Sequence, residues 1–377
     1  MRVLHINGNY IYTALHQNMI ISLNQVGISN DVFVPVFDSE RGIIKPIESV
    51  QVVKCFNKTD RLCFHIKQKK IYKALKQRTK LESYDCIHAY TLFSDGYCAM
   101  KASKQYGIPY VVAVRNTDVN MFFKYMLHLR DIGLMVLENA SKVFFLSEPY
   151  KKAVIEKYVP ARLKEIIDSK SVIIPNGIDS FWLSNIYNSK DISESLARFS
   201  NKTIRLIYTG TINRNKNIGL TTKAMELLKN QGWKVALEVV GPIADQSIYQ
   251  QIVRNENVSY TKKLPKEELI KKYREADIFV MPSHTESFGL VYVEAMSQGL
   301  PVIYTKGQGF DGQFPEGKVG YAVDDRNASG IAAAIKEAAE RYEELSNHAV
   351  EGSKRFQWDD ICRNYAGIYS AVVRNAT

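Results

Sequence analysis

The sequence predicts an α/β protein made of two doubly wound domains with a cleft between them. The chain has 377 residues, which is enough to bury two separate cores. In both halves, short apolar runs rich in β-branched residues alternate with longer amphipathic segments. This alternation is typical of parallel strands whose sheet is covered by helices on both faces.

A polar stretch at residues 181–203 lacks strand character and separates the two halves. The strands predicted before it are RVLHI, DVFVPV, DCIHAY, YVVAV, KVFFL and SVIIP. Those predicted after it are IRLIYTG, KVALEVVG, NVSYT, DIFVMPS and PVIYT. We therefore predict an N-terminal domain over 1–180, a linker over 181–203 and a C-terminal domain over 204–356.

Composition narrows the class of protein. Hydrophobic residues make up 46% of the chain and charged residues 24%, as in ordinary globular proteins. The opening MRVLHINGN predicts a buried strand instead of a secretory signal, and no apolar run approaches the roughly 18 residues of a spanning helix. The five cysteines are scattered, which indicates reduced thiols. We therefore expect a cytoplasmic protein.

The net charge of +11 is concentrated in the first half. Residues 1–180 hold 25 Lys and Arg against 16 acidic residues, whereas the rest of the chain holds 25 against 23. This asymmetry indicates an anionic partner for the first half. The basic stretch HIKQKKIYKALKQRTK at 65–80 fits a solvated surface helix, or a helix that contacts an anionic membrane surface or a lipid diphosphate. Nucleic acid is a third option, but no recognisable reading motif is present.

Two glutamates, Glu286 and Glu294, flank a glycine directly after the strand DIFVMPS. A loop is expected at Glu286 and a helix from FGLVYVEAMSQG, so the amides of Phe288, Gly289 and Leu290 would lie at the helix N-terminus. Bare amides there favour an anion such as phosphate, and a carboxylate further along could accept hydrogen bonds from a ribose diol. The alternative is that both glutamates only complement the helix dipole.

PSHTESFGLVYVEAMSQGLPV resembles the E-x7-E signature of retaining GT-B glycosyltransferases, in particular glycosyltransferase family 4. Other similar pieces follow the family's order: VIIPNGID, IRLIYTGTINRNKNIG, LEVVGP, KEELIKKYREADIFVMPS and the final FQWDDICRNYAGIY. The resemblance implies that Glu294 binds the donor's ribose and that Glu286 contacts the transferred sugar. It also implies that the 288–290 amides face the sugar and diphosphate, and that a helix from about 357 to 377 returns to the first domain.

The family commonly has Gly-Arg and then Lys-Gly after the first strand of the second domain. This chain has Gly210-Thr211 and Lys216-Asn217, so Lys216 matches and Arg214 is the candidate substitute for the missing arginine. The alternative is that both cations are solvated. There is no D-x-D motif, and we expect neither a metal ion nor a cofactor beyond the nucleotide sugar.

In the first half, Gly8 stands where the family often has a glycine pair near the donor phosphate, although a plain turn is as good an interpretation. Arg115 and Asp118 follow a predicted strand, and we interpret them as contacts to the donor sugar or acceptor, with a structural Arg–Asp pair as the alternative. His16 and His88 remain unassigned.

The expected function is retaining transfer of a sugar from a UDP- or GDP-linked donor to a glycan or lipid-linked acceptor, in cell-surface polysaccharide or glycolipid synthesis. We expect the enzyme in the cytoplasm, with peripheral attachment to the inner face of the membrane as an option. The alternatives are a nucleotide-sugar epimerase of the same fold and a non-catalytic basic module that binds membrane or RNA.

Overall fold

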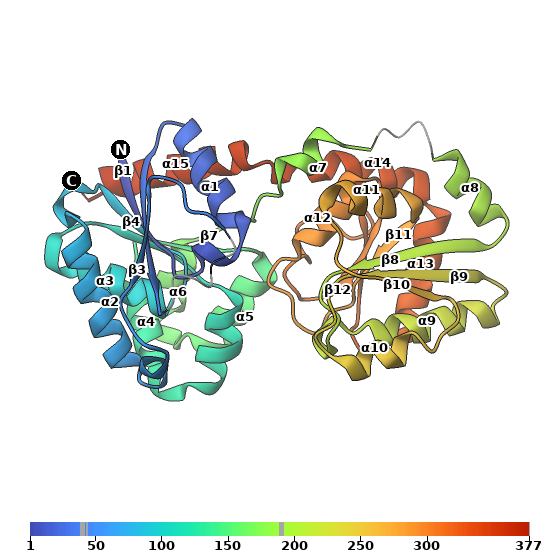
Figure 1. The fold of residues 1–377 in the computed structure, drawn as a ribbon, viewed down its shortest axis with the longest axis horizontal. Coiled ribbons are helices and arrows are strands. Elements are labelled where there is room, and N and C mark those ends of the chain that lie inside the picture. The colour runs from blue at the N-terminus through green and yellow to red at the C-terminus, as the bar shows by residue number, and fades with distance from the viewer. Residues whose placement is uncertain (38–41, 43, 188–191, 377) are drawn as a thin grey trace. The chain divides into compact units, whose positions relative to one another are not determined.

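The computed structural model describes residues 1–37, 42, 44–187 and 192–376. It divides into two compact units, whose helices and strands are labelled in Figure 1. Unit 1 comprises Met1–Gly177 and Trp358–Thr377, and unit 2 comprises Ile178–Gln357. Each unit contains a parallel sheet with helices around it, which confirms the predicted α/β class.

The sheet of unit 1 has seven strands in the order β3-β2-β1-β4-β5-β6-β7. The strands are β1 (Arg2–Ile6), β2 (Ser29–Val36), β3 (Val50–Lys54), β4 (Cys86–Ala89), β5 (Tyr110–Ala113), β6 (Lys142–Phe145) and β7 (Ser171–Ile173). Strand β1 pairs with β2 on one side and with β4 on the other, so the strand order reverses there. Ligands of open α/β sheets bind beyond the carboxyl ends of the strands at such a reversal.

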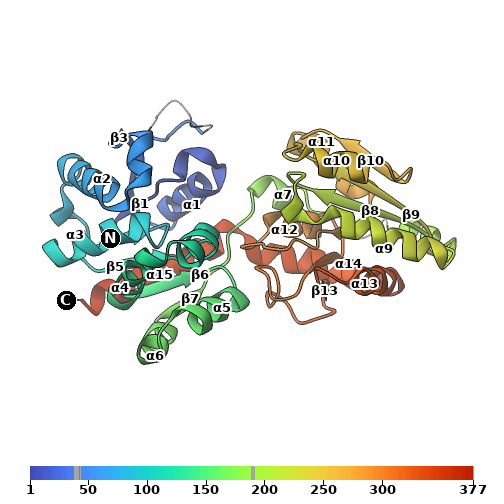
Figure 2. The same cartoon turned by 90° about the horizontal axis from the view of Figure 1, so that it is seen from below.

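Helices cover both faces of this sheet (Figures 1 and 2). One face packs against α1 (Ala14–Gln25) and α15 (Trp358–Arg374). The opposite face packs against α2 (Phe64–Arg78), α3 (Ser94–Tyr106), α4 (Arg130–Asn139), α5 (Glu148–Tyr158) and α6 (Ala161–Ser169). Helix α15 lies along α1, and Ser22 on α1 donates a hydrogen bond of 3.0 Å to Asp359 on α15. The last helix of the chain is thus part of unit 1.

The sheet of unit 2 has six strands in the order β10-β9-β8-β11-β12-β13. The strands are β8 (Thr203–Thr209), β9 (Lys234–Val240), β10 (Val258–Thr261), β11 (Ile278–Val280), β12 (Val302–Thr305) and β13 (Gly320–Val323). The helices are α7 (Ser180–Ser184), α8 (Ser193–Ser200), α9 (Ile218–Asn230), α10 (Gln246–Ile252), α11 (Lys266–Glu275), α12 (Leu290–Ser297), α13 (Ala328–Glu340) and α14 (Tyr342–Ser353). The order reverses at β8, which pairs with β9 and β11.

The range 181–203, predicted as a linker, belongs to unit 2 and carries α7 and α8. Its residues 188–191 lie outside the described part of the chain. Helix α8 is held by the buried Asp277, whose carboxylate accepts a hydrogen bond of 2.7 Å from Ser195 and pairs with Arg198. The polar residues that suggested a linker therefore satisfy a buried carboxylate, and the linker prediction is corrected.

Candidate active site

Two loops that follow the neighbouring strands β8 and β11 are joined by Asn215. The side-chain Nδ2 of Asn215 donates to the carbonyl of Thr285 at 2.8 Å, and its Oδ1 accepts from the Thr285 amide and hydroxyl at 3.0 and 2.7 Å. The backbone carbonyl of Asn215 also accepts from the amide of His284 at 2.8 Å. These bonds hold the Lys216 loop against the Glu286 loop.

Lys216 lies between two asparagines that fix its backbone. Asn213 accepts a hydrogen bond from the Lys216 amide at 3.2 Å. Asn217 has a φ of 56°, in the left-handed region that Gly adopts freely and Asn tolerates better than most residues. Its side chain donates to the carbonyls of Pro282 and Asp325 at 3.1 and 2.8 Å. Asparagine can therefore stand where the family commonly has glycine.

Lys216 and Glu286 form an ion pair, with Nζ at 2.6 Å from Oε2. The Glu286 backbone is fixed on both sides, because its amide donates to Gln308 at 3.0 Å and its carbonyl accepts from Gly309 at 2.8 Å. A Cβ on Gly309 would lie 2.1 Å from the backbone carbon and oxygen of Ser287, so only glycine allows this approach. The structure thus brings two predicted site residues into direct contact.

Helix α12 begins beside this ion pair. Gly289 precedes the helix with a φ of 80°, and a Cβ there would lie 2.5 Å from the ring of Tyr292. Tyr292 is fixed by a hydrogen bond of 2.6 Å to the carbonyl of Met281. For the amides of Phe288, Gly289 and Leu290, the described residues provide no hydrogen-bond acceptor. Three backbone donors are therefore available next to Glu286.

Glu294 lies further along α12 and is half-buried. Burial raises the pKa of Glu294 to about 7, and the charge of Asp179 adds to the effect. Lys266, which is ion-paired with Asp179, and a hydrogen bond from Trp182 act in the opposite direction. Among the described residues, no hydrogen bond or ion pair joins Glu294 to Glu286. The two glutamates thus lie in different surroundings on one helix–loop segment.

Arg214 is exposed on the short helical turn Arg214–Lys216. It lies near Asp245, whose pKa is lowered by hydrogen bonds from Ser247 and Ile248 and also by the charge of Arg214. The ion pair with Glu286 is made by Lys216. Arg214 is therefore in the predicted loop but outside the Lys216–Glu286 contact.

In unit 1, Asp118 is buried, and its carboxylate accepts hydrogen bonds from three backbone amides. The donors are Leu92 at 3.0 Å, Phe93 at 3.3 Å and Arg115 at 2.8 Å. The Arg115 side chain instead extends to Asn176, with Nη1 at 3.5 Å from Oδ1. Asp118 therefore joins the loops after β4 and β5, and among the described residues no hydrogen bond or ion pair links its side chain to that of Arg115. This geometry gives Asp118 a structural role, and its interpretation as a contact to the donor sugar or acceptor stays a prediction.

Gly8 follows β1 and lies against Asp95, at the start of α3. A Cβ on Gly8 would meet an Asp95 carboxylate oxygen at 3.6 Å and the Pro35 carbonyl at 3.7 Å, which are ordinary contacts. Burial raises the pKa of Asp95 to about 7, although Thr91 donates to its carboxylate at 3.0 Å and the Gly8 amide also donates to it. Asp95 was not among the predicted site residues. The signal that could have found it is an acidic residue in the first turn of a helix, shortly after a strand.

Two family descriptions match the chain one after the other. The family described as "Glycosyltransferase Family 4" matches residues 17–180, and "Glycosyl transferases group 1" matches residues 189–356. The two matches cover most of both units in the order that the motifs predict. The chain belongs to glycosyltransferase family 4.

Two relatives are similar to this glycosyltransferase over most of their own length. An uncharacterized glycosyltransferase of Methanocaldococcus jannaschii is 23% identical over 80% of this chain and 79% of the relative. The D-inositol 3-phosphate glycosyltransferase of Paenarthrobacter aurescens is 24% identical over 73% of this chain and 70% of the relative. Their similarity supports the assignment to a glycosyltransferase family.

Solved structures identify the fold as GT-B. Sucrose-phosphate synthase from Thermosynechococcus elongatus superposes with a TM-score of 0.75 at 19% identity, covering 100% of both chains. Anabaena HepE, in a complex with UDP and glucose, superposes with a TM-score of 0.70 at 19% identity over 98% of this chain and 100% of HepE. Both comparisons concern the fold.

The two histidines left unassigned are buried in unit 1 of the glycosyltransferase. His88 Nδ1 lies 2.6 Å from the hydroxyl of Tyr369, and burial holds the pKa of His88 well below its usual range. Burial also lowers the pKa of His16 to about 3. Both imidazoles are therefore neutral parts of the core near neutral pH.

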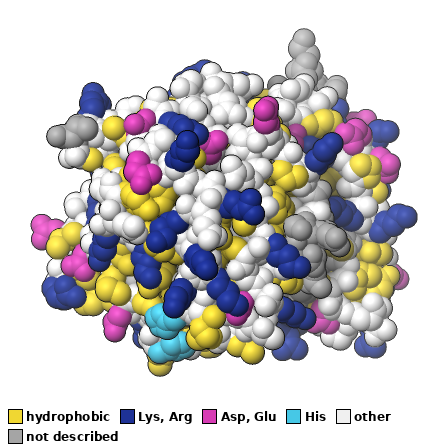
Figure 3. All heavy atoms as spheres, turned by 60° about the vertical axis from the view of Figure 1, so that its left-hand side comes forward, with side chains coloured by type: hydrophobic (Ala, Val, Ile, Leu, Met, Phe, Trp, Pro, Cys, Tyr) yellow, Lys and Arg dark blue, Asp and Glu magenta, His cyan; other side chains and the backbone are white. Residues whose placement is uncertain are grey.

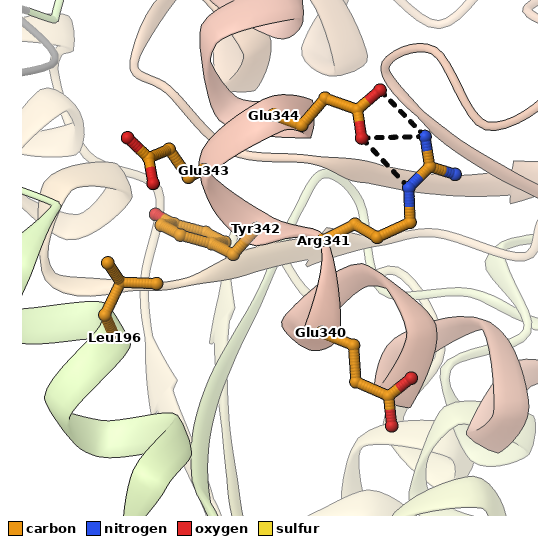
Figure 4. A pocket seen from close by; sticks show the side chains of 6 residues that line it. All are labelled: Leu196, Glu340, Arg341, Tyr342, Glu343 and Glu344. Carbon is orange, nitrogen blue, oxygen red and sulfur yellow. Dashed lines mark hydrogen bonds and ion pairs between the residues drawn. The ribbon is translucent and has the colours of Figure 1, made fainter.

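Unit 2 also contains a pocket of about 450 Å³ (Figure 4), and neither Lys216 nor Glu286 is among its lining residues. It is lined by Leu196, Glu340, Arg341, Tyr342, Glu343 and Glu344. The Arg341 guanidinium binds the Glu344 carboxylate through bonds of 2.9 and 3.0 Å, so its charge is already paired. None of the predicted site residues lines this pocket.

Within the described ranges, no helix is both long enough and apolar enough to cross a membrane.

Proposed function

We propose that this family 4 glycosyltransferase transfers a sugar, with retention of configuration, from a UDP- or GDP-linked donor to a glycan or lipid-linked acceptor. The observation that carries the proposal is the Lys216–Glu286 pair of 2.6 Å beside the available amides at the start of α12. This arrangement offers positive charge for a diphosphate and negative charge for the sugar ring at adjacent points. The UDP complex of the structurally similar Anabaena HepE supports a nucleotide-sugar donor.

In this mechanism, the departing diphosphate gains negative charge, which Lys216 and the amides of Phe288, Gly289 and Leu290 stabilise. The sugar ring gains positive charge, which Glu286 stabilises from the same loop. The acceptor attacks from the face that the diphosphate leaves, and a diphosphate oxygen takes the acceptor's proton. Groups of the protein stabilise both the negative charge on the diphosphate and the positive charge on the sugar ring. We therefore propose that neither a metal ion nor a further cofactor takes part.

The remaining residues have supporting roles in the proposal. Glu294 binds the donor's ribose, and Arg214 reaches the diphosphate from its exposed position. In unit 1, Gly8 and Arg115 lie at the carboxyl edge of the sheet. Gly8 allows close approach of the donor phosphate and the acceptor, and Arg115 contacts the donor sugar or the acceptor. Asp118 is left out of the scheme because it is buried and its carboxylate already accepts hydrogen bonds from three backbone amides.

We also propose a place of action. The enzyme works at the inner face of a membrane in cell-surface polysaccharide or glycolipid synthesis, and the basic stretch 65–80 brings unit 1 to anionic lipid. The excess of Lys and Arg in residues 1–180 supports this proposal, because basic residues near an anionic surface each contribute about 1 kcal/mol of attraction.

The proposal is tested by screening nucleotide sugars for thermal stabilisation and then analysing the product. A ligand at about 100 times its dissociation constant adds about 2.7 kcal/mol to the free energy of unfolding. With the donor found, NMR should show an acceptor-dependent product with the donor's anomeric configuration, unchanged by a chelator. An inverted product or a loss of activity on chelation would contradict the mechanism, and acceptor-independent conversion of the nucleotide sugar would indicate an epimerase.

The raised pKa of Glu294 predicts a pH dependence of nucleotide binding. Burial favours the neutral acid up to about pH 7, whereas a ribose diol needs the ionised carboxylate as acceptor. Affinity for the nucleoside diphosphate should therefore rise as the pH rises through about 7. Calorimetry of the parent and of Glu294→Gln separates this effect from protonation of the diphosphate, which both proteins share. If the parent and Glu294→Gln bind the nucleoside diphosphate with equal affinity and equal pH profiles, Glu294 does not bind the ribose.

A further inference from the structure

The most exposed large apolar side chains of the described residues come from two segments of unit 1. They are Leu62, Tyr125, Leu127 and Ile66, at 91%, 69%, 62% and 50% exposure. Leu62 ends the short helical turn Lys58–Leu62, and Ile66 lies in the first turn of α2. The other two lie between Asp118 and Leu129, a run that contains two short helical turns. Exposure of this extent on two separate segments indicates an interaction surface.

The two segments are packed together. The ring of Phe64, the first residue of α2, lies 6.3 Å from the ring of Phe122, centroid to centroid. Phe122 in turn stacks on Phe93 at 4.6 Å. Phe64 and Phe122 are partly buried and fix both segments on the core. The exposed apolar side chains on these two joined segments are Leu62, Ile66, Met121, Tyr125 and Leu127, and we call this set the apolar tip.

The apolar tip is surrounded by positive charge. Residues 58–78 and 118–130 together hold ten Lys or Arg residues and only two acids. One acid, Asp118, is buried, and the other, Asp60, is paired with Lys70 at 2.7 Å. Figure 3 shows Lys and Arg side chains lying among apolar ones on the side of the molecule that it brings forward, where acidic groups are visible as well.

We propose that the apolar tip inserts into an anionic lipid surface while the surrounding lysines contact the headgroups. This proposal rests on the membrane location given above and names the side chains that provide it. Apolar side chains flanked by Lys and Arg are typical of segments that lie in a membrane interface. Lipid fits better than a protein partner, because the core of a protein interface is depleted in lysine.

The apolar tip is also tied to the edge of the sheet that carries Arg115. Asp118 begins the second segment, and its carboxylate holds the amides of Leu92, Phe93 and Arg115 in the loops after β4 and β5. A lipid surface that binds the apolar tip would therefore lie a few residues along the chain from Arg115, which we propose contacts the donor sugar or the acceptor. Docking by this surface would present lipid headgroups to that side of unit 1.

The experiment is vesicle flotation with phosphatidylcholine, with and without phosphatidylglycerol. We expect the parent to bind the anionic vesicles, and Leu62→Asn/Leu127→Asn to bind them about tenfold or more weakly. Ile166→Asn, an exposed apolar residue of α6 in the same unit, is the matched control and should bind as the parent does. Lys69→Glu/Lys73→Glu should also lose binding, whereas Lys234→Glu/Lys318→Glu, with the same net charge, should keep it.

Nucleotide-sugar binding in the absence of vesicles is measured on the same variants. If vesicle binding behaves as expected but no nucleotide sugar binds, the proposed function fails and the docking surface stands. The docking proposal is overturned if the parent ignores anionic vesicles or binds neutral ones equally well. It is also overturned if the Leu62/Leu127 variant binds as the parent does, or if the parent binds only RNA.

Discussion

Glu286→Gln is expected to reduce turnover by about 10²–10³-fold while nucleoside diphosphate still binds. Its backbone is held by hydrogen bonds to Gln308 and Gly309, and its carboxylate lies 2.6 Å from Lys216. The amide of the variant keeps the size of the side chain but removes the negative charge that the proposal assigns to the sugar ring. The loss should therefore appear in kcat and not in the affinity for the diphosphate.

Steady-state kinetics and calorimetry check this expectation on the same protein preparation. Glu275→Gln, which changes an exposed carboxylate at the end of α11, is the control and should keep full activity. Lys216→Ala should also slow turnover, but unlike Glu286→Gln it should weaken diphosphate binding as well. If Glu286→Gln retains parental turnover, Glu286 has no role at the sugar ring.

The pairing of Lys216 with Glu286 was within reach of sequence reasoning. Each residue follows a strand of a parallel sheet, and the motifs in which they lie resemble one family in the expected order. The strands β8 and β11 are neighbours because the sheet reverses there, so their loops meet at its carboxyl edge. The asparagines that join the loops carried no such signal, because Asn is common in any polar loop.

Strands β3 and β13, at one edge of each sheet, were absent from the predicted set. The predicted strands are apolar runs, as expected for parallel strands buried on both faces. β3 instead keeps exposed Gln51 and Lys54, so its sequence is not a continuous apolar run. β13 has four residues and begins at Gly320, where a Cβ would lie 1.8 Å from the carbonyl oxygen of Val302. The search for apolar runs therefore did not find β3, which has exposed polar residues at the edge of its sheet. It did not find β13 because this strand is short and begins with a glycine that the close backbone approach requires.

Asp118 shows a different limit of sequence reasoning. An acidic residue after a strand fits a substrate contact and a structural role equally well, and the choice depends on which groups surround it. Here three amides from two loops converge on the carboxylate, which is a long-range arrangement that sequence order does not reveal. Asp277 in unit 2 is similar, because its partners on α8 lie about 80 residues earlier, in the range predicted as a linker.

A chain that ends at Gln357 is expected to lose the folded structure of unit 1. Helix α15 buries Trp358, Ile361, Cys362, Tyr365, Tyr369 and Val372 against the sheet and α1. Each large apolar side chain contributes roughly 1.5–3 kcal/mol on full burial, so the helix provides on the order of 10 kcal/mol. This is comparable to the roughly 5–15 kcal/mol that stabilises a whole domain.

Hydrogen exchange read by mass spectrometry locates the damage, because protection should be lost in β1, β4 and α1 of unit 1. A chain that ends at Arg374 keeps all of α15 and is the control for truncation itself. Tyr369→Phe is a milder variant, because it removes the 2.6 Å contact to the buried His88 but keeps the ring, at a cost of about 1–3 kcal/mol. Since α15 closes one face of the unit 1 sheet, parental protection of β1 and β4 in the truncated chain would show that the rest of unit 1 folds without it.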